Sequence, residues 1–146
     1  MAGIHRRALR TRSPGVAAAL GVWVTLALMQ TLAAKEKNMV VEYIRYEIPP
    51  AQHETFLGAY RAAATDLSGA PECLHYEISQ GIEEPNNFVV RIEWQSQEAH
   101  EHGFRQGAHF PPFFAKVKPF FSNIREMKHY RVAAEGKGKG SAPGGG

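Results

Sequence analysis

Along residues 39–132, stretches with the two-residue alternation of a strand are interspersed with stretches that have the 3.6-residue spacing of a helix. In four stretches, β-branched and aromatic residues alternate with charged or polar ones, which is the pattern of a half-buried strand. We therefore predict strands at 40–48, 73–80, 88–94 and 124–132.

Between these strands, apolar residues recur at the spacing of a helix face. A first helix is predicted after Pro49-Pro50, ending at Ser68-Gly69. A second helix is predicted from Ser96, a good N-cap, to about Gln106. A short third helix is expected before the last strand, with one apolar stripe made of Phe110, Phe113, Phe114 and Val117.

The resulting order is β-α-β-β-α-β with a short extra helix, which predicts a ferredoxin-like α+β fold. Helices on one side of a four-stranded sheet leave its other face open. We expect Tyr43 or Tyr46, together with Tyr130, on that open face among charged residues. A second copy of the chain would cover such a face, so a homodimer is predicted.

The two ends of the chain differ from this central domain. Residues 1–38 carry six basic residues and one acid, whereas residues 39–132 carry nine Lys or Arg and twelve Asp or Glu. The folded part is therefore mildly acidic, and we do not expect it to bind nucleic acid. Residues 133–146 are rich in Gly and Lys and are predicted to be a disordered tail.

An uncharged segment, residues 15–34, follows a basic head that contains Arg6 and Arg7. This arrangement is typical of an export signal or membrane anchor, and twenty residues suffice to span a bilayer. We expect an exported or membrane-associated protein on this basis. The alternative is that translation starts at Met39, that residues 1–38 are a spurious extension, and that the protein is cytoplasmic.

Phenylalanines and histidines gather between Trp94 and Phe121, a composition that suits an apolar small-molecule pocket with a few polar groups. At 3.6 residues per turn, His100 should face the sheet, and His102 and Arg105 should face solvent. Two glycines on the His100 side, Gly103 and Gly107, would leave room for a ligand.

Other aromatic residues of this region are candidates for the same pocket. Trp94 could form its wall, and His109 lies on a loop that could close it. Phe104, Phe110 and Phe114 are candidate lining residues, although the phenylalanines are expected first of all in the core, and core packing would explain Trp94 equally well. Structural roles are expected for His75 and His129. No metal site is predicted, because the histidines lack a recognised ligand spacing, and the lone Cys73 is expected to be a small buried residue.

Three passages resemble the antibiotic biosynthesis monooxygenase family: IEWQSQEAHEHGFR, HFPPFF and the closing IREMKHY. The resemblance covers about residues 39–132 and implies a dimeric α/β barrel related to quinol monooxygenases. It implies oxidation of a small phenolic or quinol-type aromatic compound by molecular oxygen without a cofactor. In such chemistry a deprotonated substrate itself delivers an electron to oxygen, so a base is needed. His100 matches the family pattern and is the candidate base or proton shuttle.

Two alternatives stay open. The same scaffold could serve a non-catalytic ligand-binding or stress-response protein. Haem-degrading relatives resemble one another in an Asn on the first strand, a Trp on the third and a His on the following helix. Trp94 and His100 match that pattern, but the first strand has no Asn.

Overall fold

A computed structural model describes residues 24–31 and 38–140. Residues 24–31 are helical and belong to a different compact unit from residues 38–140, so the two are described separately. Among the described residues, no helix has the length and apolar character needed to cross a bilayer. Most of the predicted anchor at 15–34 lies outside the described residues.

The central domain has the predicted order of elements. The strands are β1 (Val40–Glu47), β2 (Cys73–Gln80), β3 (Asn87–Trp94) and β4 (Ile124–Tyr130). The helices are α2 (His53–Gly69), the π-helix η2 (Ala99–Phe104), α3 (Phe110–Val117) and two 3₁₀ segments, η1 (Pro50–Gln52) and η3 (Lys118–Asn123).

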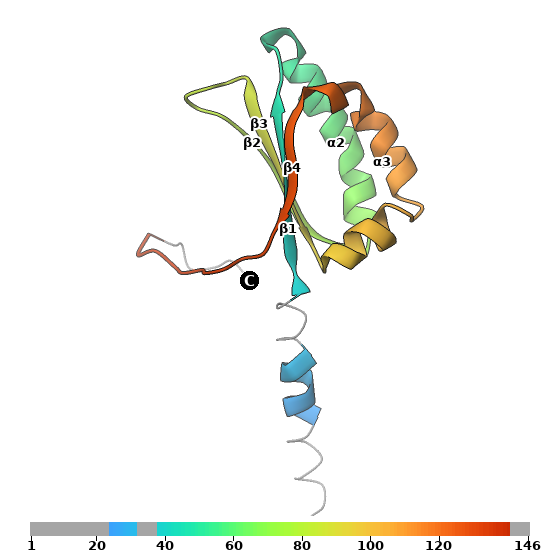
Figure 1. The fold of residues 1–146 in the computed structure, drawn as a ribbon, viewed down its shortest axis with the longest axis vertical. Coiled ribbons are helices and arrows are strands. Elements are labelled where there is room, and N and C mark those ends of the chain that lie inside the picture. The colour runs from blue at the N-terminus through green and yellow to red at the C-terminus, as the bar shows by residue number, and fades with distance from the viewer. Residues whose placement is uncertain (1–23, 32–37, 141–146) are drawn as a thin grey trace, which may run out of the picture. The chain divides into compact units, whose positions relative to one another are not determined.

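All strand pairs are antiparallel, in the order β2-β3-β1-β4. Figure 1 shows α2 and α3 together on one side of this sheet. The predicted ferredoxin-like α+β fold is confirmed. The four strands form an open sheet rather than a closed barrel, and assembly into a dimeric barrel stays a prediction.

Local sequence signals explain where the helices lie. The predicted apolar face of α2 is buried through Phe56, Tyr60, Ala63 and Leu67. The predicted N-cap is also present, because the Ser96 hydroxyl accepts a hydrogen bond from the Ala99 backbone N–H at 2.9 Å.

Strand β1 lies in the middle of the sheet, and every second side chain of this strand faces the helices. Ile44 and Tyr46 are buried on this side, and so is Glu42. Glu42 stands opposite Ile92 of β3 and His129 of β4. The centre of the sheet therefore carries a carboxyl group beneath the helices.

The pairing of β1 with β4 contains a register shift between Arg45 and Tyr46. Arg45 pairs with Glu126 but Tyr46 pairs with Ile124, so β4 holds one extra residue at this point. The bulge changes which residues of β4 face the helices. Beyond it, Met127 and His129 turn toward the helix side.

The open face of the sheet carries aromatic and charged residues. Tyr43 and Tyr130 pack edge to face with ring centroids 5.5 Å apart. Arg91 pairs with Glu93 at 2.6 Å, and its Nε also donates a hydrogen bond to the Tyr43 hydroxyl. Tyr46, the alternative to Tyr43 in our prediction, instead lies on the helix side.

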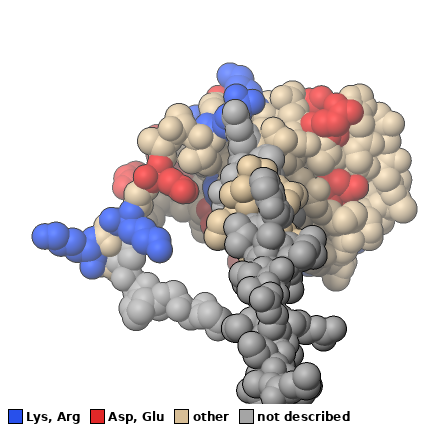
Figure 2. All heavy atoms as spheres, turned by 90° about the horizontal axis from the view of Figure 1, so that it is seen from below, with Lys and Arg blue, Asp and Glu red and all other residues tan. Residues whose placement is uncertain are grey.

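Charged residues of both signs occur in separate small groups on the face drawn in Figure 2. After β4, residues 131–138 form neither helix nor strand and are exposed. The rest of the predicted disordered tail lies mainly outside the described residues.

Candidate active site

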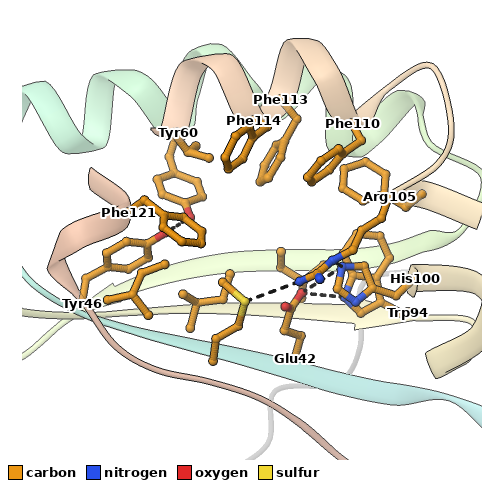
Figure 3. Close-up of a pocket in the computed structure, with 16 residues that line it drawn as sticks. Glu42, Tyr46, Tyr60, Trp94, His100, Arg105, Phe110, Phe113, Phe114 and Phe121 are labelled. Carbon is orange, nitrogen blue, oxygen red and sulfur yellow. Dashed lines mark hydrogen bonds and ion pairs between the residues drawn. The ribbon is translucent and has the colours of Figure 1, made fainter. Parts of the chain in front are cut away.

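A cavity of about 140 Å³ lies between the sheet and helix α3. Its walls are mostly apolar, and polar groups stand at two ends, as Figure 3 shows. Phe110, Phe113 and Phe114 of α3 cover it opposite the sheet. The lining is completed by Glu42, Ile44, Tyr46, Tyr60, Ile92, Trp94, His100, Phe104, Arg105, Val117, Phe121, Ile124 and Met127.

Glu42 provides the carboxyl group at one end of the cavity. Only 2% of the residue is exposed, and its Oε2 accepts a hydrogen bond from Trp94 Nε1 at 3.0 Å. Burial raises the pKa of Glu42 to about 7, although the Trp94 hydrogen bond and the Arg105 charge oppose the rise. At neutral pH this carboxyl group is therefore present in both protonation states.

His100 stacks on Trp94, with ring centroids 4.3 Å apart and planes 12° from parallel. Its Nε2 lies 3.6 Å from Glu42 Oε2, and its Nδ1 shares a hydrogen bond of 2.7 Å with His129 Nε2. Burial, with the positive charge of Arg105 and the neighbouring His129, lowers the pKa of His100 to about 3. The imidazole is therefore neutral at physiological pH.

Arg105 reaches the same cluster from the end of η2. Its Nε donates to His100 Nε2 at 3.4 Å, and its Nη2 contacts Met127 Sδ at 3.5 Å. Arg105 is exposed, as predicted, but it also lines the cavity, which our prediction missed. The reason is the π-helical turn, in which the Arg105 N–H bonds the carbonyl of His100, five residues back. This wider turn brings residue 105 round to the side of residue 100.

The other end of the cavity carries two tyrosines. Tyr46 of β1 and Tyr60 of α2 share a hydrogen bond of 2.8 Å between their hydroxyl groups, and both are buried. Burial raises the pKa of Tyr46 to about 12 and the pKa of Tyr60 well above its usual value. This pair is neutral throughout the physiological pH range.

The fold agrees with comparisons to known proteins. The family model for antibiotic biosynthesis monooxygenase matches residues 39–116. The chain belongs to this family. Among curated proteins, YczJ of Bacillus subtilis (strain 168) is 26% identical over 93 residues, which cover 64% of this chain and 98% of YczJ.

Solved structures share the monooxygenase family's fold. A candidate antibiotic biosynthesis monooxygenase from Bordetella bronchiseptica matches with a TM-score of 0.59 and 21% identity, covering 66% of this chain and 99% of its own. SnoaB from Streptomyces nogalater, a cofactor-independent oxygenase, was solved as the N63A mutant. It matches with a TM-score of 0.55 and 14% identity, covering 67% of this chain and 96% of its own.

Most of the residues predicted from the sequence of this family member meet at the cavity. His100, Trp94, Phe104, Phe110 and Phe114 all line it. His102 lies outside the cavity with more than half of its side chain exposed, as predicted.

His109 is not brought to the cavity. It precedes the first residue of α3, and its ring packs so close to Gly69 that a Cβ there would lie 2.9 Å from His109 Cε1. The hypothesis that His109 closes the pocket is therefore wrong, and its ring instead fills the space beside the end of α2.

The two glycines of the second helical segment do not make room for a ligand. A Cβ on Gly103 would lie 2.8 Å from Glu72 Cγ, and one on Gly107 would lie 2.8 Å from the Gly103 carbonyl oxygen. These glycines allow the chain to pack against itself, which corrects our interpretation of them.

Three polar residues of the cluster were missed: Glu42, Arg105 and His129. Glu42 carried a usable signal, since it falls in the apolar phase of β1 with Ile44 and Tyr46. The positions of Arg105 and His129 depend on the π-turn and the bulge, and neither feature has a signature in the alternation of residues.

Glu42, His100 and His129 are also the group of described residues that could hold a metal ion, with ligand atoms within 4.8 Å of one another. Their geometry fits a proton-sharing chain better. Two imidazole nitrogens on one zinc ion, each about 2.0–2.1 Å from the metal, would be farther apart than the 2.7 Å between His100 Nδ1 and His129 Nε2. The Arg105 guanidinium beside them also disfavours a second cation.

Proposed function

We propose that this family member is a cofactor-independent monooxygenase that oxidises a small phenolic or quinol-type aromatic compound with molecular oxygen. One observation carries the proposal: an aromatic-walled cavity with an acid–base cluster and a guanidinium at one end. The relationship to SnoaB, a cofactor-independent oxygenase, supports the same reaction class.

The cavity suits a small substrate. Its volume of about 140 Å³ is below the roughly 300–1,000 Å³ typical of pockets for drug-sized ligands. Phe104, Phe113 and Trp94 offer ring faces and edges to an aromatic guest and keep water away from it. A one- or two-ring compound fits these walls better than a macrocycle such as haem.

The proposed reaction balances without an external reductant. The substrate O–H loses its proton, and the resulting anion gives one electron to oxygen. The carbon radical and superoxide then combine into a peroxide, which loses water to leave a new carbonyl. A ring C–H and O–H are thereby converted to two carbonyl groups, with one oxygen atom in the quinone product and one in water.

The residues at the polar end have complementary roles in this reaction. Arg105 lines the cavity from an exposed position and places a positive charge where the substrate oxyanion forms, which stabilises the anion. His100 can pass a proton through its two ring nitrogens, both of which have polar neighbours. Trp94 holds the His100 ring in place by stacking.

Oxygen uptake by the purified protein with a panel of quinols and naphthols tests the proposal. Labelled oxygen gas should place one labelled atom in the product and one in water. His100→Ala should lower turnover at least tenfold, whereas His102→Ala, on the exposed side of the same helix, should leave it unchanged. Saturable ligand binding without oxygen consumption across the panel would instead favour the non-catalytic alternative.

Two further expectations concern assembly and location. We propose that two copies pair through the open sheet face that carries Tyr43, Arg91 and Tyr130, which light scattering of the purified protein would test. We also propose that residues 15–34 mediate export or membrane association. Mass spectrometry of the native N-terminus and cell fractionation would distinguish this from a start at Met39.

A further inference from the structure

Of the titratable side chains that line the cavity, Glu42 is the one suited to accept a proton at neutral pH. The others are Tyr46, Tyr60, His100 and Arg105. The tyrosines are neutral, a guanidinium donates hydrogen bonds and has no acceptor atom, and a histidine whose pKa is about 3 is too weak a base to hold a proton. Glu42, with a pKa of about 7, matches the working pH of a general base.

A chain of side chains connects Glu42 with the surface. His100 Nε2 lies 3.6 Å from Glu42 Oε2, His100 Nδ1 lies 2.7 Å from His129 Nε2, and His129 is partly exposed. The 3.6 Å step is longer than a hydrogen bond, but catalytic contacts often tighten only when the substrate is bound. His129 does not line the cavity, so its role would be exercised through His100.

The charges around this chain define its resting proton arrangement. Arg105 Nε donates to His100 Nε2, which places the His100 proton on Nδ1, directed at His129. The Arg105 charge acts on Glu42, His100 and His129, while Glu101 faces His129 from η2. If Arg105 turns to a substrate oxyanion, His100 Nε2 becomes free to accept the proton from Glu42.

We propose that Glu42 is the catalytic base and that His100 and His129 conduct the abstracted proton from the cavity to solvent. This inference depends on the proposed function, because it assumes a phenolic hydroxyl beside Glu42. The phenolic O–H bond breaks and its proton adds to a Glu42 oxygen. Glu42 then protonates His100 Nε2, while the Nδ1 proton of His100 passes to His129 Nε2.

A proton leaves His129 from its other nitrogen, so the net change is a bound phenolate and one proton in solvent. One proton returns along the same chain to the peroxide and restores the starting tautomers, and the second hydrogen of the water comes from the ring C–H. His129 is thus a relay residue, distinct from Glu42, which contacts the substrate.

Proton uptake on binding of 4-nitrophenol tests the role of Glu42 without requiring turnover. At about pH 8 both the ligand and Glu42 are ionised in the free state, and placing the two anions together should draw in about one proton. Calorimetry in buffers of different ionisation enthalpy measures this number. Glu42→Gln should reduce it to near zero, whereas Glu47→Gln, at the exposed end of the same strand, should keep it.

The wild-type protein alone provides a second measurement if the Glu42 variant fails to fold. Proton uptake should increase as the pH passes about 7, following the Glu42 titration. Uptake near zero at about pH 8 in the wild type, or undiminished uptake in Glu42→Gln, would overturn the assignment of the base. Absence of any binding to the wild type would overturn the proposed phenolic site together with it.

The relay is tested by His129→Asn, with His75→Asn on the outer strand β2 as the matched control. Loss of the relay should lower kcat about tenfold with little change in KM, and added imidazole should restore part of kcat. A purely structural role would not be rescued by imidazole. Unchanged kcat in His129→Asn, or loss of wild-type turnover on treatment with EDTA, would overturn the relay.

Discussion

The two polar ends of the cavity are both built on strand β1 and both are buried, but their side chains differ in chemistry. Glu42 and Tyr46 lie on the same face of β1, four residues and thus roughly 13 Å apart along the strand, and both are almost fully buried. The tyrosine end is a closed pair of neutral hydroxyl groups, each satisfied by the other. The glutamate end joins a carboxyl, two imidazoles and a guanidinium whose protons can move.

The difference between the two ends shows that burial alone does not make a side chain reactive. Burying the tyrosine hydroxyls raises their pKa values further from neutrality, so the pair becomes chemically more inert. The same desolvation moves Glu42 toward neutrality, because an acidic group starts from the other side of pH 7. Reactivity in this cavity therefore depends on which kind of group is buried. We expect the glutamate end to take part in the chemistry and the tyrosine end to shape the cavity.

The largest expected difference between the two ends is in the effect of their substitutions on kcat. Glu42→Gln removes the base at nearly constant volume and should lower kcat by about 10²–10⁴-fold. Tyr46→Phe should lower it less than about tenfold, because that hydroxyl only completes a neutral pair. Steady-state oxygen uptake measures both. Equal losses in the two variants would remove the distinction between a reactive and a structural end.

Substitution of Arg105 should cause the next largest loss of kcat. Arg105→Met keeps an unbranched side chain but removes the charge beside the developing oxyanion, and we expect a loss of about 10²–10³-fold in kcat. Arg61→Gln, on an exposed part of α2, is the matched control and should be neutral. If Arg105→Met changes only KM, the guanidinium binds substrate and transition state equally well.

Stability should also depend on pH differently at the two ends. Burial raises the pKa of Glu42 from its ordinary value of 4.5 to about 7 in the folded state, so its contribution is fully favourable below about pH 4.5 and is lost as the pH rises through 7. Relative to Glu42→Gln, the wild type should lose about 3 kcal/mol across that range. Denaturant unfolding at several pH values measures this.

The tyrosine end provides the control for this pH dependence of stability. Tyr46→Phe should show the same pH dependence as the wild type between about pH 4.5 and 8, because both tyrosines stay protonated there. A wild-type curve parallel to that of Glu42→Gln would mean that Glu42 titrates at an ordinary pKa. His100 acts in the opposite direction, since its lowered pKa costs stability as the pH falls below about 6.5.

The smallest effect is expected from breaking the tyrosine pair. Tyr60→Phe leaves the buried Tyr46 hydroxyl without its partner and should cost about 1–3 kcal/mol of unfolding free energy. The double variant Tyr46→Phe with Tyr60→Phe removes both hydroxyls and should cost less than the sum of the single changes. Additive losses would show that the two hydroxyls act independently.

Much of the fold could be predicted from the sequence, because its signals are local. Alternation identified the strands, helical spacing identified the face of α2 from Phe56 to Leu67, and Ser96 marked the start of the next helix. The same periodicity placed His100 inside and His102 outside. The lining of the cavity by Trp94 and the phenylalanines of α3 also follows from their apolar phase.

The sequence by itself therefore determined the order of elements, the apolar cavity wall and one of its histidines. Only the tertiary structure decided the chemistry at the polar end. A π-turn brings Arg105 to the lining of the cavity, and a bulge in β4 turns His129 toward Glu42. Each of these features shifts the chain by one residue and so changes the direction of the side chains that follow. Neither can be read from the alternation of apolar and polar residues, because that alternation assumes a regular helix or strand.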